Sequence, residues 1–176
     1  MGFIHMPNSW LRTTTALILF GVSFGFVEAA VVVYLRAIYE PLRQLYLPWA
    51  DPRELFPLIT LEQLNQAGPR YQQMLAVELM REAATMALLT SIALALSRNL
   101  RQGVAAFAIA FGIWDIAFYV FLKLAIGWPS SLFERDLLFL LPAPWVGPVL
   151  APVMVSAAMI ACGFLFLWRE WNGRPV

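Results

Sequence analysis

The sequence is poor in the side chains that build metal and redox centres. It contains one cysteine, Cys162, and one histidine, His5. Haem, zinc and copper sites usually need clusters of cysteine or histidine, which this chain alone cannot supply. A single cysteine also excludes a disulfide within the chain. Neither a P-loop nor a dinucleotide-binding fingerprint is present. We therefore expect no bound cofactor.

Charged residues are also scarce. They make up 13% of the chain, whereas 61% of its residues are hydrophobic. A soluble domain is about 25% charged and about 45–50% apolar, so both differences are typical of a membrane protein. The net charge is only +1 and no basic cluster is present, which argues against a nucleic-acid partner. The lipid bilayer is the expected environment.

Four apolar segments are long enough to cross a bilayer, which takes about 20 residues. They cover residues 14–35, 75–96, 103–126 and 147–168. Tryptophans stand near the proposed span ends, as membrane interfaces favour: Trp10, Trp49, Trp128, Trp145, Trp168 and Trp171. We predict an all-α polytopic membrane protein whose residues 1–176 form a single integral membrane domain.

Two connecting segments carry further signals. Residues 36–74 contain five prolines and are predicted to be a long outer loop, with a short helix that begins near Thr60 and ends at Gly68. In the second segment, the capping box Ser131–Glu134 precedes an apolar run that ends at Pro142. A helix near 132–141 is too short to span, so we predict an interfacial or re-entrant helix. Pro152 should kink the last span.

The placement of arginines predicts the orientation. Arginines are dense in the short terminal segments and in the turn at 97–102, whereas the other side spreads them through longer, acid-rich loops. This difference favours a multi-pass protein of the cell membrane with both termini in the cytoplasm. The inner arginines are Arg12, Arg98, Arg101, Arg169 and Arg174, and the outer ones are Arg36, Arg43, Arg53, Arg70 and Arg135.

Six ionisable side chains lie in or at the ends of the apolar segments. A charge at membrane depth costs about 2.5–3.5 kcal/mol, so it usually faces protein or water. These charges gather in one half of the bundle, so we predict a polar site there. Tyr119 shares a helical stripe with Asp115 and Lys123. The candidate ligand-binding residues are Glu28, Arg81, Glu82, Asp115, Tyr119 and Lys123; Glu78 is the sixth charge. No catalytic or metal-ligating role is assigned to any of them.

Each of these charges also has a purely structural interpretation. Glu78 and Arg81 are three residues apart and can pair at the start of the second span. Lys123 can extend to the outer surface instead of facing the site. Asp115 can form an interhelical pair, for which Arg81 is the expected partner. Glu28 or Glu82 is the expected partner if Lys123 faces inward.

Small residues predict which helix faces are packed. Gly21 and Gly25 form a Gly-x-x-x-Gly pattern on the side of the first span that carries Glu28. Ala108 and Gly112 form a similar pair of small residues, four positions apart, on the Asp115 side of the third span. Because small residues let helix backbones approach closely, we expect the polar faces to be the packed faces.

Three function classes remain open. The first is a carrier or channel-like transport protein for protons or a hard cation, because carboxylates exchange protons for cations and oxygen ligands suit such cations. The second is a structural or assembly subunit, whose charges pair with another membrane subunit or a second copy of the chain. The third is a membrane enzyme acting on a lipid or another membrane substrate, with Glu82 or Asp115 as general acid or base.

Overall fold

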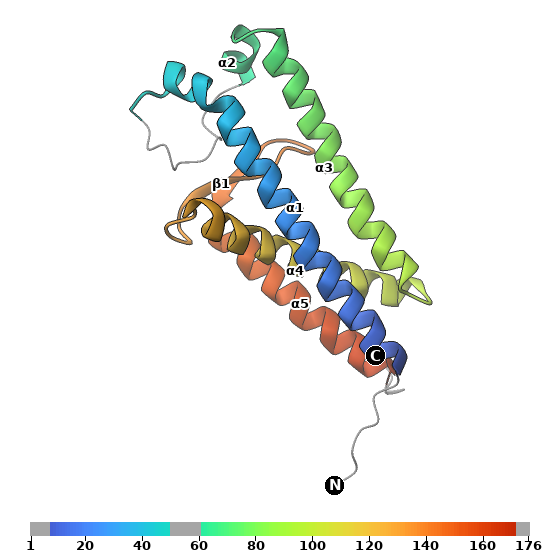
Figure 1. Ribbon diagram of the computed structural model, residues 1–176. Coiled ribbons are helices and arrows are strands. Elements are labelled where there is room, and N and C mark those ends of the chain that lie inside the picture. Colours follow the sequence, from blue (N-terminus) through green and yellow to red (C-terminus); the bar gives the residue numbers. More distant parts are fainter. Residues whose placement is uncertain (1–7, 50–60, 172–176) are drawn as a thin grey trace.

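The computed structural model describes residues 8–49 and 61–171. Four long helices and one β-hairpin make up most of this part of the chain (Figure 1). The helices are α1 (Asn8–Tyr46), α2 (Leu61–Gln66), α3 (Pro69–Ala95), α4 (Leu100–Ile126) and α5 (Leu150–Trp171), and the strands are β1 (Arg135–Phe139) and β2 (Trp145–Pro148). The mostly helical class predicted from the sequence is therefore confirmed.

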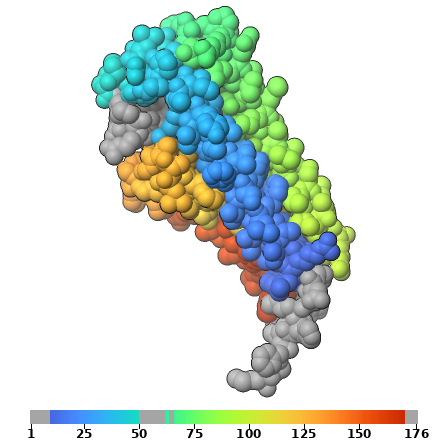
Figure 2. Space-filling view, viewed as in Figure 1, coloured from blue at the N-terminus to red at the C-terminus, as the bar shows by residue number. Residues whose placement is uncertain are grey.

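Helix α4 is the centre of the bundle because it packs against α1, α3 and α5. Its buried positions are rich in small residues, such as Ala106, Ala110 and Gly112, which let the neighbouring helices approach closely. The main apolar core combines α4 with residues from the other three long helices: Leu17, Leu89, Ile109, Trp114 and Leu167. Figure 2 shows α1 crossing this face of the molecule, between α3 on one side and the end of α4 with the segment that follows it on the other.

The two glycines of α1 lie directly against α4, so the small-residue face of α1 is packed, as predicted. A Cβ atom on Gly25 would be 2.7 Å from the Cβ of Ala117 and 2.8 Å from the carbonyl oxygen of Trp114, and one on Gly21 would meet Ile113. Gly112 instead faces α5, where a Cβ would be 2.6 Å from the carbonyl oxygen of Ser156. Small residues therefore bring α4 close to both neighbours.

The glycines of α1 also belong to a Gly-x-Ser-x-Gly pattern, the sequence signature of a nucleophilic serine. That chemistry needs a sharp strand-to-helix turn around the serine. Here the pattern lies inside a continuous helix, and Ser23 is exposed. The pattern therefore contributes to helix packing and does not form a nucleophile elbow.

Among residues 8–49 and 61–171, three helical segments are long and apolar enough to cross a membrane: Trp10–Tyr46, Leu100–Ile126 and Leu150–Glu170. They suggest a membrane location and are compatible with a small membrane protein. The fourth predicted span, at 75–96, does form a helix, but its role as a span is not confirmed. Any stretch of α3 long enough to cross includes Glu78, Arg81 and Glu82, and each charge opposes insertion.

Helix α1 continues to Tyr46, so the start of the predicted outer loop at 36–74 is helical and Pro41 lies inside the helix. Residues 61–66 form the expected short helix, which ends before Gly68; Thr60, its predicted first residue, is outside the described residues. Pro152 lies in the first turn of α5. Its missing N–H interrupts no helical hydrogen bond there, so the expected kink is wrong.

The predicted interfacial or re-entrant helix near 132–141 is wrong. Residues Arg135–Phe139 form strand β1, which pairs antiparallel with β2, so that Asp136 lies opposite Gly147 and Leu137 opposite Val146. The apolar run is followed by Pro142 and Pro144, which favour a turn between two short strands. Pairing satisfies the backbone groups that the two strands direct toward each other, whereas a single short helix would leave its ends open.

One end of the bundle carries the start of α1, the α3–α4 turn and the end of α5 (Figure 1). The side chain of Gln102, near the start of α4, donates a hydrogen bond of 3.2 Å to Glu170, near the end of α5. Of the arginines predicted to face the cytoplasm, Arg12, Arg98, Arg101 and Arg169 belong to these segments. Arg174, and Arg53 among the arginines predicted to face outward, are outside the described residues. The cytoplasmic orientation stays a prediction.

Candidate functional site

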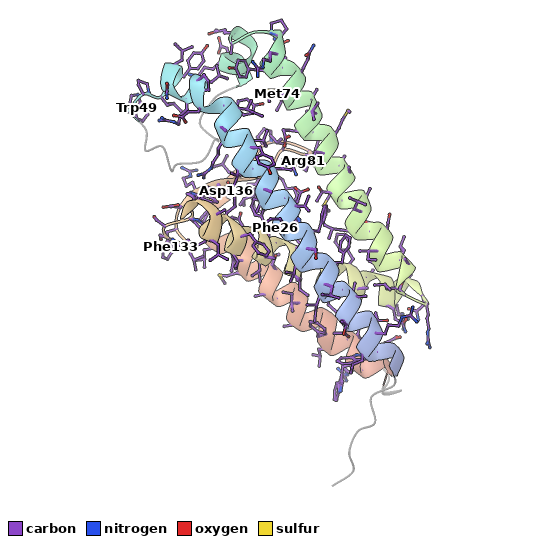
Figure 3. The ribbon with its side chains drawn as sticks, in the orientation of Figure 1. Phe26, Trp49, Met74, Arg81, Phe133 and Asp136 are labelled. Carbon is purple, nitrogen blue, oxygen red and sulfur yellow. The ribbon has the colours of Figure 1, made fainter. Side chains whose placement is uncertain are left out.

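A cavity of about 160 Å³ lies between α1, α3, α4 and the β1 strand. Its polar wall contains five acids, two arginines and Thr85, and leucines, Val32 and aromatic residues form the rest. Figure 3 labels Arg81 and Asp136, which approach the middle of α1 from α3 and from the hairpin. The charged lining residues are Glu28, Arg36, Glu78, Arg81, Glu82, Asp115 and Asp136.

Arg81 of α3 forms ion pairs with two acids of the cavity wall. Its Nη1 atom contacts Glu28 Oε2 of α1, and its Nε atom donates to Glu78 Oε2 at 2.8 Å. The hydroxyl of Thr85 donates to Glu28 Oε1 at 3.0 Å. Both oxygens of Glu28 are therefore engaged, and the charge of Arg81 is shared between two carboxylates.

Glu82 connects α3 to the hairpin. Its two carboxylate oxygens accept hydrogen bonds from the backbone N–H groups of Leu140 and Leu141, at 2.8 and 2.9 Å. These residues follow β1 directly, so the contact positions one wall of the cavity. Glu82 thus has a clear structural role, and neither of its oxygens is left without a donor.

Asp115 and Asp136 form a different group at the cavity. Asp115 of α4 is 7% exposed and accepts a 2.8 Å hydrogen bond from Ser156 of α5, whereas Asp136 is 6% exposed and accepts one of 2.8 Å from Tyr119. The backbone N–H of Leu137 also donates to Asp136. Within residues 8–49 and 61–171, no salt bridge reaches either aspartate. Both buried acids thus have uncharged donors.

The environment of Asp136 shifts its titration. Burial raises the pKa of Asp136 to about 6, although the hydrogen bonds from Tyr119 and Leu137 and the charge of Arg36 act in the opposite direction. The nearby charge of Asp115 adds to the upward shift. Asp136 can therefore gain or lose a proton near neutral pH.

Lys123 is not part of this cavity. Its ammonium group donates to the carbonyl oxygens of Gly127, at 3.2 Å, and Pro129, at 2.7 Å, beyond the end of α4. Helix C-termini carry exposed carbonyls and partial negative charge, which a lysine stabilises. The predicted partners Glu28 and Glu82 are bound elsewhere, and the expected Arg81–Asp115 pair is wrong because Arg81 pairs with Glu28 and Glu78.

The structure brings together five of the six candidate residues, namely Glu28, Arg81, Glu82, Asp115 and Tyr119. Sequence reasoning missed Asp136 because its segment was interpreted as a helix outside the bundle. It also missed Arg36, whose guanidinium lies 5.3 Å from the ring centre of Trp128. Ser156 is a small polar residue in an apolar helix, a signal that can mark an interhelical hydrogen bond.

The donor set of the cavity can be compared with that of a metal site. In the described part of the chain, no three His, Cys, Asp or Glu side chains lie close enough together to hold a metal ion. The acids instead accept from one arginine, three backbone amides and three hydroxyl groups. With five acids against two arginines, the cavity has an excess of negative charge when all of them are ionised. Comparison with protein-family models, with curated proteins and with solved structures found no match.

Proposed function

We propose that this chain is an integral protein of the cell membrane that binds and releases protons at Asp115 and Asp136. These protons exchange with the water at one face of the membrane. The observation that supports this most directly is the pairing of these buried aspartates with hydroxyl groups instead of cations. An ionised carboxylate is costly in such a place unless a proton or a cation compensates it.

Tyr119 supports a shared role for the two aspartates. It follows Asp115 by one helical turn on α4, and its hydroxyl donates to Asp136 on the hairpin. A tyrosine hydroxyl can donate and accept a hydrogen bond, so it can take part in a proton relay. The proposed site therefore consists of Asp115, Tyr119 and Asp136, and Ser156 orients the first of them.

A proton fits this site better than a hard metal cation. Magnesium and calcium need about six or more oxygen ligands around one point. The oxygens of Glu28 and Glu82 already accept hydrogen bonds or an ion pair, and the described residues contain no group of three potential metal ligands. We therefore favour the proton over the hard cation as the exchanged ion.

The surroundings of the site favour exchange on one side over passage through the bundle. Between the cavity and the end where α1 begins, the core consists of apolar residues such as Leu17, Leu89, Ala106 and Ile109. A proton path would need polar groups or water in this region. The transport hypothesis thus has less support here than a one-sided site, while the assembly and enzyme hypotheses have no specific contact in their favour.

Proton uptake by the purified protein tests the proposal. The protein in uncharged detergent is moved from pH 8 to pH 5, and the protons taken up per chain are counted with a pH indicator. We expect Asp136→Asn to lose uptake centred near pH 6, and a double variant with Asp115→Asn to lose more. Glu62→Gln, which removes an exposed acid of α2, is the control. Equal uptake by wild type and double variant would refute the proposal.

A further inference from the structure

The cavity beside Asp115 has room for a small organic molecule. Its volume of about 160 Å³ is close to that of an apolar protein cavity of about 150 Å³ that accommodates benzene. The cavity therefore suits a molecule, or one end of a larger molecule, of about six to eight non-hydrogen atoms. A single proton does not account for a space of this size.

Much of the cavity wall is apolar. Val32 and Leu35 contribute from α1, Leu75 from α3 and Phe118 from α4, and the hairpin adds residues 137–140. Such a surface favours a ligand with a hydrocarbon body, because burying apolar area is worth about 25 cal/mol per Å². Purely polar ions or sugars would leave this wall without a matching partner.

The polar wall selects the charge of the ligand. Asp115 uses only its Oδ2 atom, with Ser156, and Glu78 uses only its Oε2 atom, with Arg81. The second oxygen of each has no hydrogen-bond partner within the described residues, although both side chains line the cavity. Asp115 is more than nine-tenths buried. An unused carboxylate oxygen in such a place is an acceptor for a charged donor.

The excess of acids in this wall opposes an anionic ligand. Arg81 is already paired with Glu28 and Glu78, and Arg36 lies over the ring of Trp128. The five lining acids would repel an anion, whereas an ammonium group would reduce their excess charge.

From the cavity volume, the apolar wall and the unused oxygen of Asp115, we infer that the cavity binds a small primary amine in its ammonium form. The ammonium donates to Asp115, and the hydrocarbon body contacts Leu35, Leu75 and Phe118. The inference rests on the proposed function in one respect: entry of the ammonium replaces a proton on Asp115, which leaves to bulk water. The ammonium can belong to a free amine or to the ethanolamine headgroup of a lipid.

Isothermal titration of the protein in phosphatidylcholine nanodiscs tests this inference with three ring compounds of similar size. Cyclohexylamine carries a positive charge, cyclohexanol none and cyclohexanecarboxylate a negative one. We expect saturable binding of cyclohexylamine, at least about tenfold tighter than that of the other two. The Asp115→Asn variant should weaken binding by about 10- to 100-fold, which corresponds to losing one charge-assisted hydrogen bond.

A second variant keeps the test independent of Asp115. Leu75→Trp adds bulk to the apolar wall and should abolish binding without removing a charge, whereas Glu62→Gln should bind like wild type. Equal affinity for cyclohexanol, or unchanged affinity in both cavity variants, would overturn the inference. If nanodiscs that contain phosphatidylethanolamine suppress cyclohexylamine binding, the lipid headgroup is the natural source; unchanged binding indicates a free amine.

The two proposals fail in different ways. If proton uptake depends on the aspartates but cyclohexylamine does not bind, only the amine site is refuted. If the amine binds through Asp115 but uptake is the same in wild type and double variant, only the proton proposal is refuted.

Discussion

Arg81 of α3 and Glu28 of α1 form an ion pair that joins these two helices at the cavity wall. The side chain of Glu28 is 8% exposed and that of Arg81 28% exposed, so the pair is largely shielded from water. Arg81 also pairs with Glu78, so one cation compensates two acids of this wall.

Replacing this arginine should destabilise the protein. Arg81→Ala leaves Glu28 and Glu78 without their cation, and removing one partner of a buried pair costs about 3–5 kcal/mol. We expect a loss near the lower limit, because Arg81 retains some contact with water. Asp115→Asn should cost less, since its amide oxygen still accepts from Ser156. Thermal unfolding in detergent compares them, with the exposed Arg101→Ala as control. If Arg81→Ala melts like wild type, the pair has no structural role.

Gly25→Val should separate α1 from α4. The added side chain would collide with the carbonyl oxygen of Trp114 and with Ala117, and neither the backbone nor a methyl group can rotate away. Overpacking of this kind typically costs about 1–3 kcal/mol. The melting temperature in detergent should fall, whereas Ser23→Val, on the exposed face of the same helix, should change it little. Equal effects of the two substitutions would contradict the close α1–α4 contact.

The stability of the protein should depend on pH through Asp136. Burial raises its pKa to about 6 in the folded state, compared with about 4 in an unfolded chain. Between these values the folded state binds more protons. The contribution of Asp136 to stability is therefore fully present below about pH 4 and is lost as the pH rises to about 6. Melting temperatures of wild type and Asp136→Asn from pH 4 to 8 measure it. Their difference should change with pH in this window, and a constant difference would contradict the assignment.

Removing the carboxylate of Glu82 should loosen the hairpin. Glu82→Ala leaves the N–H groups of Leu140 and Leu141 without their acceptors. We expect hydrogen exchange of these amides to become faster by roughly tenfold or more, since a hydrogen bond to a charged group is worth about 1.5–3 kcal/mol. Exchange mass spectrometry measures the peptides that contain them, and α4 peptides should be unaffected. Glu62→Ala is the matched control. Unchanged exchange in the hairpin would show that Glu82 does not hold it.

The long helices could be predicted from the sequence because the length of an apolar run is a local property. The meeting of Glu28, Arg81 and Asp115 at one cavity was also accessible, since helical spacing and the glycines at 21 and 25 indicate which faces pack. The ion-pair partner of Arg81 was not accessible in this way. Whether it contacts Glu28 or Asp115 depends on how far α3 is rotated and shifted against α4.

The hairpin was the main structural feature that local patterns missed. The run at 137–141 fits a short helix as well as a strand, and the strand exists only because Trp145–Pro148 pairs with it. The contribution of Asp136 to the site depends on that pairing, which positions its side chain beside Tyr119. The charges of α3 explain why the fourth predicted span is not confirmed. These charges form a polar face at the cavity, and they also exclude α3 from the helices that are apolar enough to span.

Infrared spectroscopy of protein labelled with ¹³C-aspartate measures protonation at the proposed site most directly. The chain contains only three aspartates, Asp51, Asp115 and Asp136, so Asp51→Asn simplifies the labelled signal to the two residues of interest. We predict a carboxylic-acid C=O band at pH 5 that decreases as the pH rises to 8, and that Asp115→Asn and Asp136→Asn each reduce. A spectrum that shows only ionised carboxylates from pH 5 to 8 would contradict proton binding by this pair.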